Sequence, residues 1–213
     1  MPEQTEKPIE KKYYDHISIA KRTKQIVHFV QEHDKTAMLE QIIKNTPEQQ
    51  TVVVTKSKRI ADEISLYLNS KDIKATAIHG NSRTAKYEET ATAFNSKEIN
   101  IVITTDMILK SLNLNNIARI ISFDLPNDEK HYYSRIAYVD EVGESISLVS
   151  PQEDKLFSTI EFLMKVEMQE EDVKDFLPTA YSDHDKVKST KDKKKKPRHT
   201  KKKVKKTAKP GEE

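Results

Sequence analysis

The stretch that most constrains the fold lies at residues 99–126, where two short apolar runs enclose a polar segment. The first run, residues 101–103, is rich in β-branched side chains, a composition typical of a strand buried on both faces. The second run, residues 117–123, leads to Pro126, which is incompatible with a central strand and ends it. Polar residues 104–106 follow the first run. Two such strands indicate a parallel sheet with a site at the carboxyl ends of its strands.

Apolar strands and amphipathic helices alternate along the rest of the sequence. Short apolar runs predict strands at residues 25–31, 51–55, 75–78 and 144–149. Helices are predicted at residues 35–44, 58–69, 84–94, 128–135 and 151–168, followed by a short acidic helix at residues 168–177. Asp34 and Ser57 are predicted N-caps, and Pro151 suits the first turn of a helix. This alternation indicates an α/β fold, a single doubly wound domain with a mainly parallel sheet.

Composition excludes several classes of protein. The 213 residues are enough for one domain and a tail. The chain has no Cys, so disulfides and thiol chemistry are excluded and a reducing compartment fits. No apolar run approaches the length of a membrane helix, and the first residues lack the apolar core of a signal peptide. We therefore expect a cytoplasmic protein without a membrane partner.

The charge is distributed unevenly along the chain. Residues 186–209 hold fourteen Lys and Arg residues and one acidic residue, a net charge of +13. Residues 1–185 hold 23 basic and 31 acidic residues, a net charge of −8. We predict three parts: a flexible lead-in at residues 1–23, one domain at residues 24–177 and a disordered Lys-rich tail at residues 178–213.

Several motifs occur in an order that resembles the second, C-terminal RecA-like domain of DEAD-box RNA helicases. Thr104-Thr-Asp106, with Leu112-Asn-Leu114 after it, is similar to the family pattern A-T-D-x-x-x-R-G-x-D-[IV]. Phe123-Asp-Leu-Pro126 is similar to the strand end Y-D-x-P. Upstream, Val52-Val-Val-Thr-Lys56 is similar to I-V-F-x-x-T-K, and His79-Gly80 is similar to the H-G that follows the next strand.

The resemblance covers roughly residues 24–155 and implies a RecA-like fold with an RNA-binding edge. In the family, residues at these strand ends help to bind the sugar-phosphate backbone through hydroxyls, backbone N–H groups and a Lys. The candidate RNA contacts implied in this way are Thr55, Lys56, Gly80, Arg83, Thr104 and Thr105. Gly80 also fits a backbone requirement, either a tight turn or the close approach of a ligand. The alternative is that these are ordinary polar residues at strand ends, kept by the fold.

The sequence departs from the family where the family carries out its chemistry. The positions of the second and third family arginines, which reach the ATP phosphates, hold Tyr138 and Glu141, and a carboxylate repels a triphosphate. The family Arg-Gly is Lys110-Ser111. Remnants of the helicase motifs remain at Asp106, Lys110, Asn113 and Arg135. We expect Arg135 to pair with Asp106 or another carboxylate as part of the structure, and Asp124 to be structural as well.

The sequence also contains no G-x-x-x-x-G-K-[ST] phosphate loop and no D-E-A-D sequence. We therefore expect a degenerate helicase domain without catalytic residues, which would bind ATP as a cofactor only if a partner chain completed the site. The seven His residues show no metal-ligand spacing, so we expect no metal.

The Lys-rich tail is a second candidate for nucleic-acid binding. Lysines release counterions from phosphates, which gives affinity that depends on salt and not on sequence. The candidate residues are Lys193, Lys194, Lys195, Lys196, Arg198, Lys201, Lys202 and Lys203. The tail could instead dock on an acidic partner or on the acidic domain of the same chain.

Three hypotheses about function follow from the sequence. The first is an RNA-binding accessory protein without ATPase activity of its own. The second is the C-terminal half of a split ATP-dependent RNA helicase, completed by a partner chain. The third is a protein-interaction module that docks on a helicase or a ribosomal protein.

Overall fold

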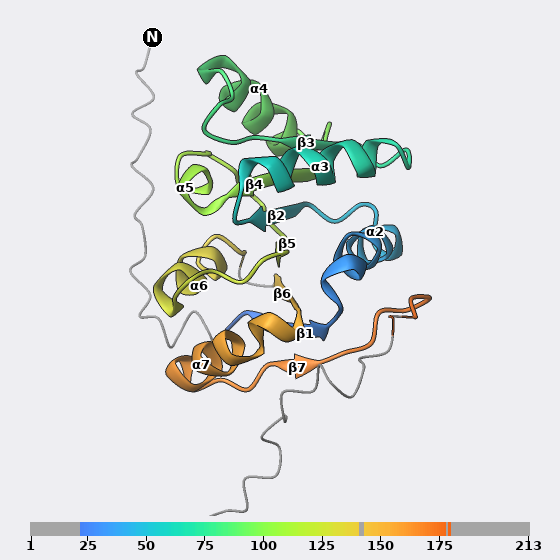
Figure 1. Cartoon of the computed structure of the whole chain (residues 1–213). Helices are drawn as coiled ribbons and strands as arrows, with labels where there is room; N and C mark the ends of the chain where they lie inside the picture. The colour runs from blue at the N-terminus through green and yellow to red at the C-terminus, as the bar shows by residue number, and fades with distance from the viewer. Residues whose placement is uncertain (1–21, 141–142, 178, 180–213) are drawn as a thin grey trace, which may run out of the picture.

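The computed structural model describes residues 22–140, 143–177 and 179, and within these ranges seven strands form one parallel sheet. The strand order is β3-β4-β2-β5-β6-β1-β7 (Figure 1). In chain order the strands are β1 (Lys24–Phe29), β2 (Thr51–Thr55), β3 (Ala75–Ala77), β4 (Ile101–Thr105), β5 (Arg119–Ser122), β6 (Glu144–Val149) and β7 (Gln169–Glu170). The predicted α/β fold with a parallel sheet is confirmed.

Helices cover both faces of the sheet, as a doubly wound fold requires. One face carries α2 (Lys35–Asn45) and α3 (Lys58–Asn69). The other face carries α4 (Thr84–Asn95), α5 (Asp106–Leu109), α6 (Glu129–Ile136) and α7 (Asp154–Met164). Figure 1 shows α5, α6 and α7 on the opposite side of the sheet from α2. Two short 3-10 helices, η1 (Glu32–Asp34) and η2 (Pro151–Glu153), precede α2 and α7.

The central strands are buried on both faces, which is why they appear in the sequence as unbroken apolar runs. All five residues of β2 are buried. Val53 packs in the cluster under α2 and α3, while Val52 and Val54 pack in the cluster on the opposite face. Because both faces of the strand are covered, both sets of alternate side chains must be apolar. The register pairs Thr55 with Thr105, so β2 and β4 end side by side at the carboxyl edge of the sheet.

Of the two predicted N-caps, one is confirmed and one is wrong. The Ser57 side chain accepts a hydrogen bond of 3.3 Å from the Ile60 backbone N–H and caps α3. Asp34 has helical backbone angles and makes no capping hydrogen bond, because the preceding 3-10 turn already continues into α2. Its carboxylate instead accepts a hydrogen bond of 2.7 Å from the backbone N–H of Thr179.

The predictions for the end of the domain need correction. The predicted helix at residues 151–168 ends at Met164, because Lys165 takes a left-handed conformation with φ 55°. The predicted acidic helix at residues 168–177 is wrong, since β7 lies there and pairs in parallel with β1. Buried Met168 and half-buried Val173 and Phe176 attach this extended segment to the apolar clusters. The segment closes the edge of the sheet beside β1.

The predicted division of the chain into three parts stays a prediction. Most of the lead-in and, apart from Thr179, the whole Lys-rich tail lie outside the described residues. In the described part of the chain, no helix has the length and apolar character needed to cross a bilayer.

Candidate nucleic-acid interface

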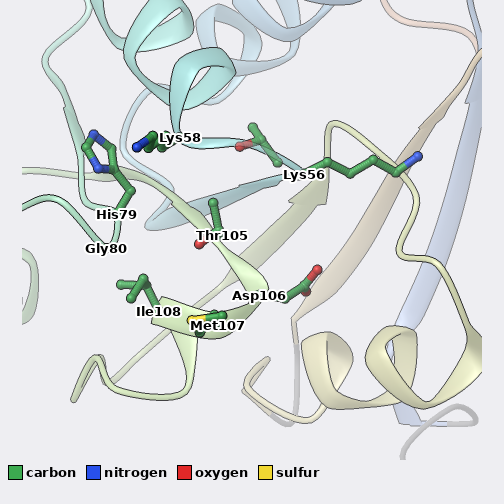
Figure 2. Close-up of a pocket in the computed structure, with 9 residues that line it drawn as sticks. Lys56, Lys58, His79, Gly80, Thr105, Asp106, Met107 and Ile108 are labelled. Carbon is green, nitrogen blue, oxygen red and sulfur yellow. The ribbon is translucent and has the colours of Figure 1, made fainter.

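A pocket of about 270 Å³ opens at the carboxyl ends of β2 and β4 (Figure 2). Its walls come from the ends of these two strands, the start of α3, the loop after β3 and the α5 turn. The lining residues are Thr55, Lys56, Lys58, His79, Gly80, Thr105, Asp106, Met107 and Ile108. Four of the six predicted contacts in the domain, together with Asp106, therefore meet in one place. The sheet register brings them together, since their sequence separation reaches 51 residues.

Thr104 and Arg83 do not line this pocket. Thr104 has no exposed surface, because alternate side chains of β4 point to opposite faces and its own side chain points into the core. Contact between the Thr104 side chain and a ligand is therefore not possible in this conformation, which corrects the prediction. Arg83 is exposed at the N-cap position of α4, outside the pocket wall.

Lys56 lies at the pocket but its side chain extends away from it, as Figure 2 shows. The Lys56 ammonium lies 3.5 Å from a carboxylate oxygen of Glu153. Its backbone N–H donates a hydrogen bond of 2.8 Å to Asp124. Lys58, which sequence reasoning missed, also lines the pocket, is exposed and forms no ion pair among the described residues. Of the two lysines in this wall, Lys58 is thus the one whose charge is not paired with a carboxylate of the described residues, and we call it uncommitted.

Glu153 connects Lys56 to a buried ion pair. The fully buried Lys35 ammonium lies 2.6 Å from one carboxylate oxygen of Glu153, and the Leu125 backbone N–H donates to the other at 3.0 Å. Burial alone would raise the pKa of the Glu153 carboxyl, but the Lys35 ammonium and the hydrogen bonds hold it below its ordinary value. Burial also acts on the neighbouring Asp124, and there it outweighs the hydrogen bond from Lys56, so that the pKa of Asp124 is raised.

Arg135 forms the predicted pair with Asp106. Its Nε and Nη2 donate to the two carboxylate oxygens of Asp106 at 2.6 and 2.7 Å, a bidentate arrangement. Its Nη1 donates to the backbone carbonyl of Asp124 at 2.7 Å. The Arg135 side chain is 1% exposed, so the guanidinium is enclosed by protein groups. Both residues act as structural ties between α6 and the end of β4.

The other motif remnants lie away from the pocket. Lys110 and Asn113 are exposed beyond α5 and do not line it. The Asn113 backbone carbonyl accepts a hydrogen bond of 2.9 Å from the Asn95 side chain, which attaches this loop to α4. Tyr138 packs half-buried against the apolar cluster under α4 and α5. Glu141 lies outside the described residues.

The loop that carries Gly80 is held by side chains. His79 Nε2 lies 2.9 Å from Asp62, and the Tyr87 hydroxyl donates to the His79 carbonyl at 3.0 Å. Gly80 has no positive φ, and a Cβ atom added there would meet nothing within 4 Å. Gly143, by contrast, has no room for a side chain, because a Cβ atom there would lie 2.7 Å from the Ala118 carbonyl oxygen. The turn therefore does not require glycine at position 80, and the close approach of a ligand stays a prediction.

The predicted tail contacts lie outside the described residues and stay predictions. They are Lys193, Lys194, Lys195, Lys196, Arg198, Lys201, Lys202 and Lys203. Within the described ranges, no group of three or more His, Asp or Glu side chains could hold a metal ion.

Comparisons with known proteins agree with this geometry. The chain is 25% identical over 131 residues to the DEAD-box ATP-dependent RNA helicase RhpA of Helicobacter pylori, which covers 60% of this chain and 27% of RhpA. The chain thus spans about a quarter of the length of this curated relative. A DEAD box protein of Methanococcus jannaschii is 27% identical, with a TM-score of 0.67 over 72% of this chain and 43% of that one.

Two further structures share the fold. The E. coli DEAD-box protein SrmB, bound to regulator of ribonuclease activity A (RraA), matches with a TM-score of 0.69 and 18% identity over 75% of this chain and 96% of that one. S. cerevisiae Dbp5 bound to RNA and ADP BeF3 matches with a TM-score of 0.68 and 20% identity over 72% of this chain and 42% of that one. The sequence profile of the helicase conserved C-terminal domain matches residues 34–139. Residues 34–139 thus form a helicase conserved C-terminal domain, which resembles the second RecA-like domain of DEAD-box RNA helicases.

Proposed function

We propose that this chain is an RNA-binding accessory protein that uses a helicase C-terminal domain without hydrolysing ATP on its own. The observation that carries the proposal is a pocket that combines an open glycine with the uncommitted Lys58, while Arg135, bound to Asp106 of the pocket wall, is fully engaged inside the protein. The open glycine and the uncommitted lysine suit a nucleic-acid strand. The engaged arginine does not suit ATP, because its three nitrogens already donate to protein groups.

The pocket offers the groups that bind a sugar-phosphate backbone. Lys58 supplies a positive charge, and Gly80 leaves the backbone open to close approach. The Thr105 side chain lies beside them at the end of β4. Contacts of this kind position a strand and carry no sequence preference. The similar fold of Dbp5, which is named as bound to RNA, supports RNA binding by a domain of this fold.

The described residues do not fit the phosphates of ATP. An arginine that stabilises a transferring phosphoryl group must present free donors to it. Arg135 is enclosed, with its donors on Asp106 and on the Asp124 carbonyl. Tyr138 has no positive charge, and the sequence has no phosphate loop. An ATP-dependent activity would therefore need residues that this sequence does not supply.

The basic tail supports RNA binding independently of the pocket. With a net charge of +13 at residues 186–209, it would neutralise phosphates on any strand within its reach. The domain is acidic, so the tail would supply most of the long-range attraction, and the pocket would supply the shorter, directed contacts.

A charge-matched pair of variants tests the pocket. The background is a tail-neutral chain, defined as the full-length protein with Gln at positions 191, 193–196, 198, 201–203, 205 and 206, which brings the net charge of residues 186–213 from +11 to zero. In this background Lys58→Ala should weaken binding of a single-stranded RNA about fivefold, equivalent to about 1 kcal/mol. Arg59→Ala removes the same charge one residue further on, from a side chain paired with Glu63 and outside the pocket, and should change affinity much less.

Equal losses in the two variants would show that only net charge matters. No RNA binding by the tail-neutral chain at low salt would show that the pocket is a remnant of the fold. The protein-interaction hypothesis would then gain, since related domains are named as bound to the proteins RraA and Gle1.

Phosphate release from ATP tests whether the chain hydrolyses ATP on its own, and a pull-down separates the accessory protein from the split helicase. The purified chain should release none above a blank, with or without RNA. Turnover that copurifies with the chain through two columns would contradict the proposal. A pull-down with and without RNase is the companion measurement, and a helicase-like ATPase that stays bound after RNase treatment would favour the split helicase.

A further inference from the structure

Met107 is presented outward by a turn whose other residues are anchored. It lies in α5 at the pocket wall and is 79% exposed. Asp106 before it is tied to Arg135, and Ile108 and Leu109 after it are 8% and 2% exposed. The backbone at Met107 is thus held from both sides. The Met107 side chain is therefore fixed beside a polar pocket, where a bound ligand can contact it.

The pocket as a whole is amphiphilic. Lys58 and the open backbone at Gly80 provide the polar side, and Met107 with Ile108 provides the apolar side (Figure 2). A free phosphate ion would use only the first. A nucleotide unit would use both, because its phosphate is anionic whereas the faces of its sugar and base are apolar. An unbranched, polarizable thioether adapts well to such a face.

Met107 is also the most accessible methionine in the described part of the molecule. The sequence has no Cys. Met38, Met164 and Met168 are 3%, 0% and 6% exposed, and Met1 lies outside the described residues. Thioether oxidation requires access to the sulfur, so a peroxide would act on Met107 well before the buried methionines.

We propose that Met107 is an oxidation site whose conversion to the sulfoxide weakens binding of an RNA strand in the pocket. The inference rests on the proposed RNA-binding function. Hydrogen peroxide is the oxidant: the sulfur attacks one peroxide oxygen, the O–O bond breaks, an S–O bond forms and the other oxygen leaves as water. Sulfur loses two electrons and peroxide gains them. Methionine sulfoxide reductases reverse the change.

Oxidation would act on binding in two ways. The sulfoxide is polar, so the apolar contact with a sugar or base is lost. Its oxygen is an acceptor placed beside an anionic strand, where the pocket already contains the partly exposed carboxylate of Asp106. The fold should not change, because the Met107 side chain contributes little to the core.

The test measures RNA binding before and after treatment with dilute hydrogen peroxide, using the tail-neutral chain and a labelled single-stranded RNA. Peptide mass spectrometry should locate one added oxygen on Met107. Affinity should fall about threefold to tenfold, the range of a lost thioether contact. In Met107→Leu the ratio of treated to untreated affinity should stay near one, whatever its starting affinity. Bound RNA should also slow the oxidation of Met107.

A matched control moves the methionine to another exposed position. Leu66 is 73% exposed on α3 and does not line the pocket. The double variant Met107→Leu with Leu66→Met should take up oxygen at residue 66 with no loss of affinity and no protection by RNA. Full oxidation of Met107 without loss of affinity, or an equal loss in Met107→Leu, would overturn the inference alone. Failure of the untreated tail-neutral chain to bind RNA would overturn both the pocket function and this inference.

Discussion

At the scale of single residues, Glu153 organises the carboxyl edge of the sheet. Its two carboxylate oxygens face the fully buried Lys35, the backbone of Leu125 and Ser150, and the ammonium of Lys56. Without this carboxylate the buried lysine would keep only the exposed carboxylate of Glu32, which lies 3.2 Å away. The contact between Glu153 and the Lys56 ammonium holds the Lys56 side chain away from the pocket. Lys58 is therefore the lysine of the pocket wall that is available to a ligand.

Removing this carboxylate should have a pH-dependent effect on stability. Glu153→Gln should lower the free energy of unfolding by about 2 kcal/mol at neutral pH, because Lys35 loses its buried partner and keeps only the exposed carboxylate of Glu32. The pKa of Glu153 is lowered in the folded protein, so its contribution is present above the pKa of the unfolded chain and is lost as pH falls through the folded pKa. Thermal unfolding should therefore show a deficit at about pH 7 that shrinks towards about pH 3.

Asp124→Asn is the control, with the opposite sign. Burial raises the pKa of Asp124, so its ionisation opposes folding as pH rises through the folded pKa. The amide can still accept the hydrogen bond from the Lys56 backbone. This variant should melt at the same or a higher temperature at neutral pH and lose any advantage in acid. A deficit in Glu153→Gln that does not change with pH would show that lost packing, not charge, dominates.

At the scale of elements, the sequence predicted the strands well because their β-branched runs are buried on both faces. The predicted meeting of residues from β2, β4 and the loop after β3 was correct for the same reason, since parallel strands end at one edge. The direction of the Lys56 side chain could not be predicted, because it depends on Glu153, far along the chain. Lys58 and Met107 were missed because an exposed residue at a helix start has no sequence signal that separates it from ordinary surface.

The segment around β7 was predicted wrongly for a different reason. Its acidic residues suggested a helix, but only Met168, Val173 and Phe176 are held by the apolar clusters. Their spacing of five and three residues does not distinguish a helix from an extended chain with turns. Pairing with β1 decided the outcome, and that pairing is a tertiary contact.

Truncation tests the contribution of this segment to stability. A chain that ends at Lys165 loses the burial of Met168, Val173 and Phe176, and its free energy of unfolding should fall by about 3 kcal/mol. A chain that ends at Thr179 keeps these contacts and the hydrogen bond to Asp34, and it should melt like the full-length protein. Equal melting temperatures for the two truncated chains would show that the segment adds nothing to the fold.

At the scale of the whole molecule, the protein joins an acidic domain to a basic tail. The two parts differ in sign, with −8 at residues 1–185 and +13 at residues 186–209. Lys side chains reach phosphates as point charges and do not read base edges, so we expect the tail to bind many strands alike. The domain would then determine how a bound strand is placed.

Salt dependence of RNA binding tests this division of roles most directly. Affinity of a labelled single-stranded RNA should be measured across a range of salt for the full-length and the tail-neutral chains. The full-length protein should lose affinity steeply as salt rises, and the logarithmic slope should become shallower by about eight on removing eleven basic residues. At low salt the tail-neutral chain should keep a weaker affinity that falls further with Lys58→Ala. Identical slopes for the two chains, or no binding by the tail-neutral chain at the lowest salt, would contradict an RNA-binding protein that uses both its tail and its pocket.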